Sequence, residues 1–528
     1  MATYDGVIVG AGHNSLTLGA YMARAGLKIC VLERAPHIGG GCSTEEPMLP
    51  GFRCNLHSNF FIGFSTAPLM RDLELQRFGF SYIEPPVQHG VALRDGTALV
   101  LHRDVEKSCA SLARFSKHDA AAFHHLHETY AVKMRPFFTA MLYNPPLSPE
   151  AMRDRLTGPA NREMLAHAPL DLFQTVDRHF EDHRIRTLFK LLMHVTTGEN
   201  EPGTGLMLPI IMSALTDVAL PVGGSVSLPL ALARVIEAGG GVVRAGAEVR
   251  EICVEGGRAT GVRLADGSRI DARRFVASGT DAPATMRLVG EEHFPDAVRQ
   301  KLDAWHWGNH SLVTLHLALD APPDYAAARF DPDLNRSLNL IFGFDDTDQL
   351  IRCFEQCRRG EFPDHLMGNG ACNSLFDPSY APAGKHVAFW WPFAPYALAD
   401  GPEGWERRRQ EYSARLLDAW RGYAPNLNKD NILGSFLYTP RDIPLHDVSM
   451  VNGAIRMGAY VPAQLGVNRP HPLLAGYRAP VEGLYLCGSS NHGGGANGAP
   501  GYNAANAVAE DLKLARPWTP IAPPDYRG

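Results

Sequence analysis

Gly10 and Gly12 are the first residues of the chain whose types and spacing could do chemistry. They follow the apolar run Tyr4–Val9, an order that predicts a strand, a tight turn and a helix. Gly10 suits the turn, and Gly12 has no side chain to keep a pyrophosphate from the free N–H groups of the first helical turn. The stretch predicts a dinucleotide site built from Gly10, Gly12, His13, Asn14 and Ser15.

An acidic residue follows at the expected distance. We expect a helix over Asn14–Ala25 and a strand over Leu27–Leu32, after which Glu33 stands 21 positions beyond Gly12. This fold places a carboxylate there to accept hydrogen bonds from ribose hydroxyls, which argues against a ribose 2′-phosphate. Ser15 departs from the pattern, which has glycine at this third position. We therefore expect the helix to sit further from the strand or the packing to accommodate the side chain.

Two more glycine clusters extend the site. Arg34 and Gly39-Gly40-Gly41 come directly after Glu33, and we expect the chain there to pass close to an extended cofactor; a simple loop is the alternative. Near the end of the chain, a short strand ends at Gly488, and a glycine-rich loop precedes a helix expected over Tyr502–Leu512. Such a loop can lie flat against a planar ring, with the helix N-terminus stabilising negative charge on it. Together the clusters predict one non-covalent FAD rather than NAD.

The middle of the chain returns to the same unit. Pro221–Ser225 precede a helix ending at Ala238, and tight turns at Glu255–Gly257 and Asp266–Gly267 predict alternating strands.

With these segments placed, the sequence resembles the phytoene desaturase and carotenoid isomerase-like flavoproteins, within the amine oxidase and glutathione reductase-like FAD superfamily. The resemblance rests on VIVGAGHNSL and LERAPHIGGG, on PVGGSVSLPLALARVIEAGG, and above all on LYLCGSSNHGGGANGAPG. It implies an α/β fold with a Rossmann-like FAD-binding domain built from three discontinuous segments, 1–75, 220–290 and 445–528. An inserted α+β substrate domain would comprise 76–219 and 291–444.

The resemblance also implies site residues. Val249 would contact adenine through its backbone, and further cofactor contacts would come from Gly40, Gly41, Ser58, Gly488, Ser489, Asn497 and Gly498. Asn55, His57 and Ser58 stand where family members commonly show aspartate, glycine and proline, and His492 stands where proline is usual. These departures put the standard carotenoid reaction in doubt more than the cofactor.

His57 and His492 are the candidate catalytic residues, because histidine exchanges protons near neutral pH and both lie close in sequence to expected flavin contacts. Each could instead hydrogen-bond only backbone or flavin carbonyls, and a turn role is an equal alternative for Ser489 and Asn497. Five aromatic residues could line an apolar pocket or pack the core: Trp390, Trp391, Phe393, Tyr396 and Tyr438.

Two further groups are interpreted as structural. Four histidines could suggest a metal, since two of them share a helix face, but no nearby cysteine or acid completes a convincing set, so we expect no metal; they are His118, His124, His125 and His127. Cys353 and Cys357 are spaced by four on an expected helix, unlike the CxxC spacing of disulfide oxidoreductases, and are interpreted as packing residues.

Composition narrows the class of protein. The chain has 528 residues, a net charge of −6 and nine scattered cysteines, which disfavours nucleic-acid binding and a disulfide framework. Neither a signal peptide nor a clean membrane span is recognisable. The longest apolar stretch, Gly205–Val222, is interrupted by Pro209 and Asp217 and is interpreted as a buried segment or an apolar substrate wall. We expect a cytoplasmic protein, with any membrane contact peripheral and through an apolar patch such as Leu206–Leu220.

The leading functional hypothesis is an FAD-dependent oxidoreductase that desaturates or otherwise oxidises an apolar, polyene or terpenoid-like small molecule. Only one dinucleotide fingerprint is visible, so electrons are expected to pass to oxygen or a quinone. The alternatives are isomerisation or saturation without net oxidation, amine oxidation, and a binding protein that retains FAD for stability without turnover.

Overall fold

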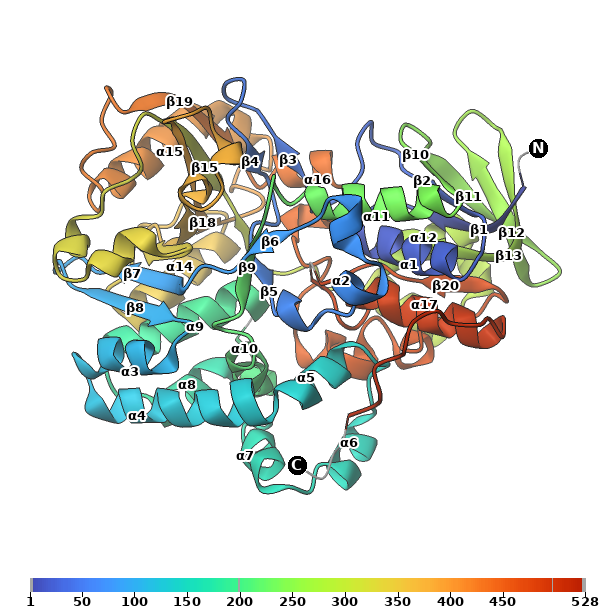
Figure 1. Ribbon diagram of the computed structural model, residues 1–528, viewed down its shortest axis with the longest axis horizontal. Helices are drawn as coiled ribbons and strands as arrows, with labels where there is room; N and C mark the ends of the chain where they lie inside the picture. Colours follow the sequence, from blue (N-terminus) through green and yellow to red (C-terminus); the bar gives the residue numbers. More distant parts are fainter. Residues whose placement is uncertain (1–2, 198–199, 496, 525–528) are drawn as a thin grey trace.

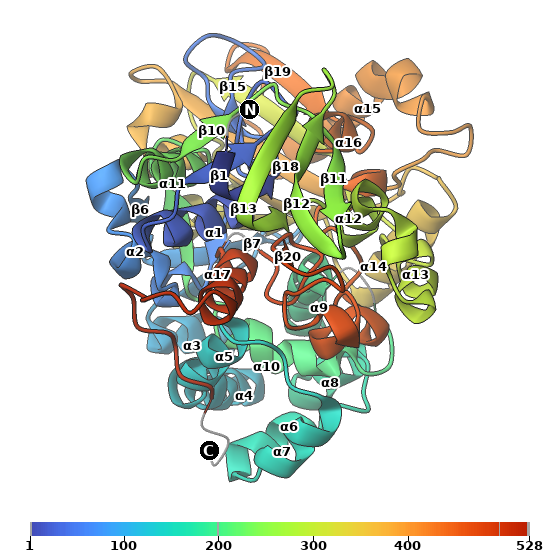
Figure 2. The same ribbon diagram turned by 90° about the vertical axis from the view of Figure 1, so that its right-hand side faces the viewer.

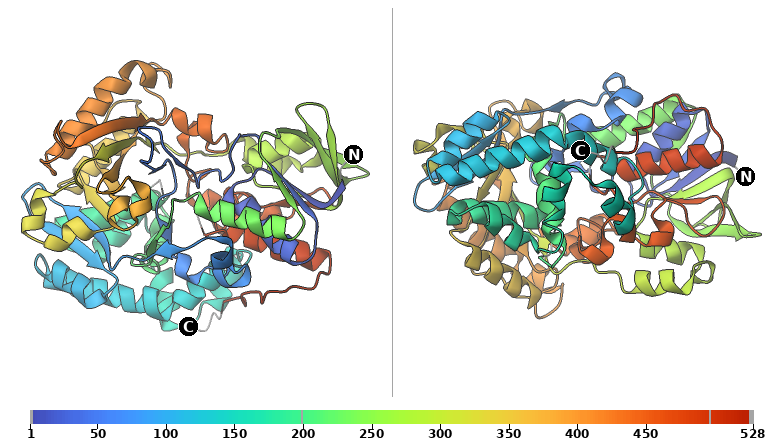
Figure 3. Two further views of the ribbon diagram at one scale, coloured as in Figure 1. Left: turned by 45° about the horizontal axis from the view of Figure 1, so that its top comes forward. Right: turned by 90° about the horizontal axis from the view of Figure 1, so that it is seen from below.

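The computed structural model describes residues 3–197, 200–495 and 497–524. Two sheets lie side by side and divide the molecule (Figure 1). Helices between residues 105 and 212 lie below the second sheet and the middle of the molecule (Figure 3, right).

The first sheet has seven strands in the order β10-β2-β1-β13-β12-β11, with β20 paired to β13. Their bounds are β1 Thr3–Val9, β2 Ile29–Leu32, β10 Val242–Arg244, β11 Val249–Glu255, β12 Arg258–Leu264, β13 Arg269–Ser278 and β20 Leu484–Leu486. β10, β2, β1, β13 and β20 run parallel, as expected of strands whose connections include covering helices. Helices α1 His13–Arg24, α11 Ser227–Ala238 and α17 Ala499–Asp511 pack on this unit, and Figure 2 brings α17 and β11–β13 to the front.

The second sheet has eight strands in the order β19-β15-β18-β17-β16-β7-β8, with β14 paired to β18. Their bounds are β7 Val87–Ala92, β8 Ala98–His102, β14 Ser311–Leu312, β15 Thr314–Leu319, β16 Asn339–Phe342, β17 Gly368–Ala371, β18 His386–Ala394 and β19 Ile432–Tyr438. All its pairings are antiparallel except that of β16 with β7. Its helices are α14 Thr347–Arg358 and α15 Gly404–Arg421.

Short strands and a helical layer connect the two sheets. The strands are β3 Thr44–Glu45 with β4 Cys54–Asn55, and β5 Phe61–Ile62, β9 Val218–Pro221 and β6 Tyr82–Ile83. The helices of the layer are α2 Leu69–Asp72, α3 Val105–Ala113, α4 Lys117–Leu126, a π-helical turn His127–Lys133, α5 Arg135–Leu142, α6 Pro149–Arg155, α7 Pro159–Leu165, α8 Leu172–His179, α9 His183–Thr197 and α10 Met207–Met212. The remaining α-helices of the described residues are α12 Ala282–Val289, α13 Asp296–Asp303 and α16 Asp442–His446. Acceptor side chains begin several of them; Asp104, for example, accepts from the backbone N–H groups of Glu106 and Lys107.

The predicted strands on either side of Gly256-Gly257 and Gly267 are confirmed, because β11 pairs with β12 and β12 with β13 across those turns. The C-terminal helix begins earlier than expected. Ala499 rather than Tyr502 is its first residue. Pro500 fits the first turn because N–H groups at that position have no partner within the helix, so the N–H that proline lacks is not missed. Gly501 therefore lies in a helix, and a Cβ there would collide with the carbonyl oxygen of Asn14 in α1. The glycine is needed for helix packing, not for a ring-facing loop.

Within the described ranges, no helix combines the length and apolar character that crossing a bilayer requires. The interpretation of the apolar stretch Gly205–Val222 as a buried segment is confirmed, so Leu206–Leu220 does not form a continuous apolar surface patch. Met207, Leu208 and Met212 are buried, as is all of β9, and Ile210 is the large apolar residue of the segment that is exposed.

Candidate functional site

Three segments far apart in the sequence meet at the N-terminus of α1. The backbone N–H of Gly39 donates to the carbonyl oxygen of Ala11 at 2.9 Å, and Gly12 bridges to Gly39. From the C-terminal segment, Ser489 Oγ accepts a 2.9 Å hydrogen bond from Asn14 Nδ2. The carbonyl oxygen of Gly495 lies 2.8 Å from His13 Nε2. The first glycine cluster, the second and the C-terminal loop thus form one continuous surface.

The surface has the form of a phosphate cradle. Gly10 adopts φ +84°, which an L side chain rarely tolerates, and a Cβ added to Gly12 would meet no atom within 4 Å. The space beside Gly12 is thus open at the N-terminus of a twelve-residue helix, where free N–H groups favour an anion. Asn14 Oδ1 and Ser43 Oγ are buried without a hydrogen-bond partner among the described residues. Open space and unsatisfied polar atoms together fit a bound dinucleotide.

The second glycine cluster, Gly39–Gly41, lies against Gly12 and borders the open space beside it. Gly40 has φ +56°, and a Cβ there would lie 3.3 Å from the Cα of Gly12. The carbonyl oxygen of Gly41 accepts a 2.9 Å hydrogen bond from the N–H of Ser58. The chain around His57 is thereby attached directly to the cradle.

Glu33 stands at the end of β2 and faces the glycine turn. Its carboxylate accepts from the N–H of Ala11 at 2.8 Å and of Ala35 at 2.9 Å. Its carbonyl oxygen accepts from Ala247 at 2.7 Å, so the start of β11 at Val249 lies along the same edge, while Arg34 is exposed. Glu33 is therefore held in place by the backbone, near where the fold positions a ribose.

Ser15 is accommodated without displacing α1. A Cβ on Gly279, just after β13, would collide with Ser15 Oγ, and Cys487 Sγ lies 3.9 Å from that oxygen. Gly488 similarly lets β20 approach the backbone of Gly279 and Thr280. The missing third glycine of the fingerprint is replaced by glycine on the facing strand, a pairing that only the fold reveals.

His492 is engaged by backbone. Its Nε2 lies 3.0 Å from the carbonyl oxygen of Met141, and its own carbonyl oxygen accepts from Tyr477 at 3.1 Å. Burial lowers its pKa, which keeps the ring neutral. Asn497 Oδ1 accepts from the N–H of Ala499 at 3.0 Å, and Gly498, with φ +72°, is the N-cap of α17. In this arrangement His492 and Asn497 shape the C-terminal loop.

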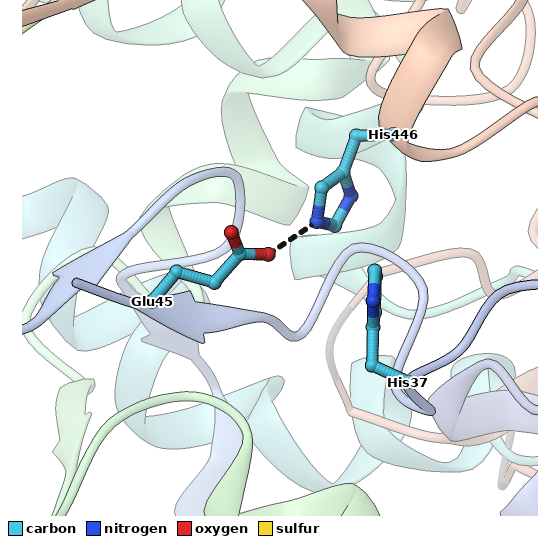
Figure 4. A group of neighbouring side chains, drawn as sticks. All are labelled: His37, Glu45 and His446. Carbon is cyan, nitrogen blue, oxygen red and sulfur yellow. Dashed lines mark hydrogen bonds and ion pairs between the residues drawn. The ribbon is translucent and has the colours of Figure 1, made fainter. Parts of the chain in front are cut away.

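His57 belongs to a hydrogen-bonded chain of side chains. Its Nε2 lies 3.2 Å from Tyr438 Oη and 3.3 Å from His446 Nδ1. Nε2 of His446 lies 2.6 Å from Glu45 Oε1 (Figure 4). Burial, reinforced by neighbouring histidines, lowers the pKa of His57 to about 3. Sequence reasoning missed Glu45 and His446, because they lie 401 positions apart and follow no motif.

The aromatic residues of β18 alternate between two cores. Trp390 packs with the cluster that includes Trp405 and Trp420 of α15. Trp391 and Phe393 face the opposite cluster, with the helical layer. Tyr438 packs with neither but in a third cluster beside the His57 segment, and Tyr396 is partly exposed. All four of these buried residues, Trp390, Trp391, Phe393 and Tyr438, therefore pack in the core, and Trp391 also contacts Phe60 beside the connecting strands.

Two further titratable residues, His316 and Asp447, lie near the site but belong to no sequence motif. His316 is 1% exposed, neither of its ring nitrogens has a partner among the described residues, and burial lowers its pKa to about 3. Asp447 follows α16, and its Oδ2 lies 3.2 Å from the position that a Cβ on Gly40 would take. Burial, with Glu33 contributing, raises the pKa of Asp447 to about 6. A carboxyl that resists ionisation therefore borders the cradle.

The groups interpreted as structural are placed as follows. His124 pairs with Glu106 at 3.3 Å. His118 does have acids nearby, contrary to expectation, since Asp119 and Glu181 bring oxygen atoms to within 4.8 Å of its ring nitrogen and of each other. Cys353 and Cys357 are both buried in α14, where burial raises the pKa of Cys357. Packing of the two thiols is confirmed.

Comparison with known proteins supports this assignment of the cradle. Residues 8–74 match the family model described as an NAD(P)-binding Rossmann-like domain. The fold resembles solved structures of putrescine oxidase, with a TM-score of 0.62 and 14% identity over 97% of this chain and 99% of that one. It also resembles cyclohexylamine oxidase from Brevibacterium oxydans, with a TM-score of 0.58 and 16% identity over 97% and 99%.

Sequence relatives cover nearly the whole chain. A limonene dehydrogenase component of Castellaniella defragrans is 32% identical over 98% of this chain and 96% of its own length. Hydroxyneurosporene desaturase of Cereibacter sphaeroides is 30% identical over 96% and 97%. With the Rossmann-like cradle and full-length identity at this level, the chain belongs to the phytoene desaturase-like family of FAD-dependent oxidoreductases.

Proposed function

We propose that this protein binds one FAD non-covalently and uses it to desaturate an apolar terpenoid or polyene hydrocarbon. The observation that carries the proposal is the meeting of Gly12, Gly39 and Ser489 in one cradle, in a chain that matches a limonene dehydrogenase component from end to end. FAD supplies the hydride acceptor that removal of hydrogen from an unactivated carbon requires.

We infer that the cradle binds FAD through the groups predicted from sequence. The N–H groups around Gly10–Ser15 and Gly40–Gly41 would hold the pyrophosphate, Glu33 the ribose, and the backbone at Val249 the adenine. Ser58, Gly488, Ser489 and Gly498 would border the ribityl chain and the flavin. What supports this is the open space at Gly12 and the unsatisfied Asn14 Oδ1.

The same reasoning favours two functional units. The strands of the first sheet come from residues 3–32, 242–278 and 484–486, and those of the second from 87–102 and 311–438. We infer that segments 1–75, 220–290 and 445–528 form the cofactor unit and that 76–219 and 291–444 bind substrate. The apolar side of β18 around Trp391 and Phe393 is the wall best suited to a hydrocarbon.

The test is anaerobic reduction of the FAD-loaded protein. Limonene, as a cyclic monoterpene, and phytoene, as a linear polyene, would be added separately, and the oxidised-flavin absorbance followed. We expect one of them to bleach the flavin and to yield a product two hydrogens lighter. Absence of bleaching by either hydrocarbon, with flavin that dithionite reduces normally, would exclude desaturation of these classes.

The same assay separates the alternatives. A product of unchanged mass, formed only by pre-reduced enzyme, would indicate isomerisation. The fold likeness to amine oxidases brings in a second candidate function; bleaching by putrescine or cyclohexylamine but by no hydrocarbon would select it. Flavin that no candidate reduces or reoxidises would favour a binding protein. Reoxidation by oxygen and by a soluble quinone, compared after reduction, identifies the electron acceptor.

A further inference from the structure

Removal of two hydrogens from a hydrocarbon also releases a proton, and the structure contains a route that could carry it. His57, His446 and Glu45 are linked by hydrogen bonds of 3.3 Å and 2.6 Å. The side chains become more accessible along the chain, from a His57 residue that is 9% exposed, through an 11% exposed His446 side chain, to a 42% exposed Glu45 side chain. Figure 4 shows the outer part, where His446 points its ring at the Glu45 carboxylate. One end of the chain is therefore internal and the other reaches solvent.

The hydrogen bonds fix which nitrogen carries each proton. A carboxylate only accepts, so Nε2 of His446 must donate to Glu45, and this leaves Nδ1 of a neutral His446 as an acceptor. The facing Nε2 of His57 is then the donor, and it shares its proton with Tyr438 Oη, whose own hydroxyl can donate to the carbonyl oxygen of Asp442 at 3.4 Å. In neutral His57 the remaining nitrogen, Nδ1, is consequently the unprotonated one.

That nitrogen is buried and has no hydrogen-bond partner among the described residues. A buried acceptor without a partner is costly and calls for an explanation, and a substrate proton would provide it. The backbone of His57 lies beside the cradle, since the N–H of the next residue, Ser58, donates to the carbonyl oxygen of Gly41. On this geometry, we propose that His57 Nδ1 is the base of the reaction and that His446 and Glu45 relay its proton to solvent.

The step rests on the proposed function and balances as follows. One C–H bond of the substrate breaks with its electron pair leaving as hydride to FAD. The neighbouring C–H bond breaks as its electron pair forms the double bond, and that proton passes to His57 Nδ1. The Nε2 proton of His57 moves to Nδ1 of His446, and the Nε2 proton of His446 moves to Glu45 and then to water. Before the next cycle each ring must return from the Nδ1–H to the Nε2–H tautomer by exchanging protons with solvent water, because the proton that leaves is not the one that arrived.

The surroundings suit this role. A pKa of about 3 keeps His57 neutral, so the Nδ1 lone pair stays available. A weak base suffices, because loss of hydride makes the neighbouring C–H strongly acidic. The hydrogen bond from His446 lowers the pKa of Glu45, so this carboxylate is ionised and ready to accept. Other titratable groups surround the chain. Tyr438, His316 and Asp447 lie on its inner side, Asp442 lies beside Tyr438, Cys54 and Glu46 lie beside Glu45, and His37 packs against His446.

The variants are chosen to keep geometry while removing proton transfer. Glu45→Gln retains an acceptor oxygen for His446 but takes up no proton, and Glu45→Asp restores a carboxylate. His446→Gln breaks the chain at its middle. His37→Gln is the matched control, because the His37 ring packs against His446 with ring centroids 4.7 Å apart yet is outside the hydrogen-bonded chain.

Proton release is measured beside flavin reduction in a single anaerobic turnover of the FAD-loaded protein, with an indicator dye in weak buffer. We expect the two signals to coincide in wild type, His37→Gln and Glu45→Asp. In Glu45→Gln and His446→Gln, we expect proton release to slow about tenfold or more. In a further variant, His446→Gly, added imidazole should fill the space of the lost ring and restore the rate of proton release. Coincident signals in both disabled variants would overturn the relay while leaving desaturation intact.

A second readout needs no substrate. Ring nitrogen shifts of ¹⁵N-histidine-labelled full-length protein report the tautomers directly, with variants for assignment. We expect His57 and His446 to carry their protons on Nε2, both in wild type and in Glu45→Gln. A proton on Nδ1 of His446, or tight stoichiometric Zn²⁺ binding that His37→Gln abolishes, would overturn the relay. If no hydrocarbon reduces the flavin, the proposed function fails. The ¹⁵N shifts then test only whether His57, His446 and Glu45 form the hydrogen-bonded chain.

Discussion

The two sheets are held in place by opposite kinds of residue. Around β1 and α1, glycines let backbones from distant segments approach, as Gly279 does against Ser15 and Gly501 against Asn14. Around β18, large aromatic side chains fill the space; Trp390, for example, stacks on Phe342 with centroids 4.5 Å apart. The first arrangement requires particular residues at particular positions, whereas the second accepts many apolar combinations of similar volume. A glycine-rich cradle can therefore be recognised in a sequence, whereas the packing of an aromatic core cannot.

The largest effect on stability should come from a side chain that prevents β13 and α1 from approaching each other at the first sheet. Gly279→Ala places a Cβ against Ser15 Oγ, and we expect a loss of unfolding free energy of about 3 kcal/mol, measured by denaturant titration. Ser15→Gly should be tolerated alone and should recover most of the loss in the double variant. Additive losses would show that the two residues do not share this space.

Asp447 tests a different property of the first sheet, namely whether a carboxyl beside the cradle destabilises the protein when it ionises. Its folded pKa of about 6 exceeds the usual 3.8, so the folded state holds this proton more tightly. Its contribution to stability is thus present below about pH 4 and is lost as pH rises to about 6. At neutral pH Asp447→Asn should stabilise the cofactor-free protein by about 2 kcal/mol. Equal melting temperatures of the variant and wild type across this range would contradict the assignment.

Gly12 separates folding from cofactor binding. Because a Cβ at Gly12 meets nothing within 4 Å, Gly12→Ala should leave the free energy of unfolding of the cofactor-free protein nearly unchanged. The same methyl group would occupy the phosphate space and should weaken FAD binding at least about tenfold, or about 1.4 kcal/mol, by fluorescence titration. Gly476→Ala, whose nearest contact would be 3.7 Å away, is the control expected to change neither quantity.

His316 tests the aromatic side. Its ring is buried against Phe389 and Phe436 without hydrogen bonds to described residues, so His316→Leu should raise stability by about 1 kcal/mol near pH 8. The folded pKa of about 3 lies below that of the unfolded chain, so wild type loses stability as pH falls from about 6.5. The advantage of the variant should therefore grow toward acid. A destabilised variant would mean that the imidazole has a partner.

Much of the first sheet could be predicted because its signals are local. The apolar run before Gly10, the acid after β2 and the glycine turns of β11–β13 each lie within a few residues of what they determine. The limits of prediction also lie at particular residues. The pattern predicts a loop at Gly501, whereas its helix begins at Ala499. For Leu206–Leu220 it allowed both a buried segment and a surface patch, because apolar residues alone do not indicate which side they face; the structure shows the segment largely buried.

The sequence by itself determined a dinucleotide cradle, since the glycines and Glu33 act through the backbone conformation of their own neighbours. It also named His57 and His492 as candidate proton carriers. Only the tertiary structure distinguished them: His492 is hydrogen-bonded to the carbonyl oxygen of Met141, whereas His57 is linked to His446 and Glu45. The reason is physical: the role of an imidazole depends on which groups its two nitrogens meet, and those groups come from segments hundreds of residues apart.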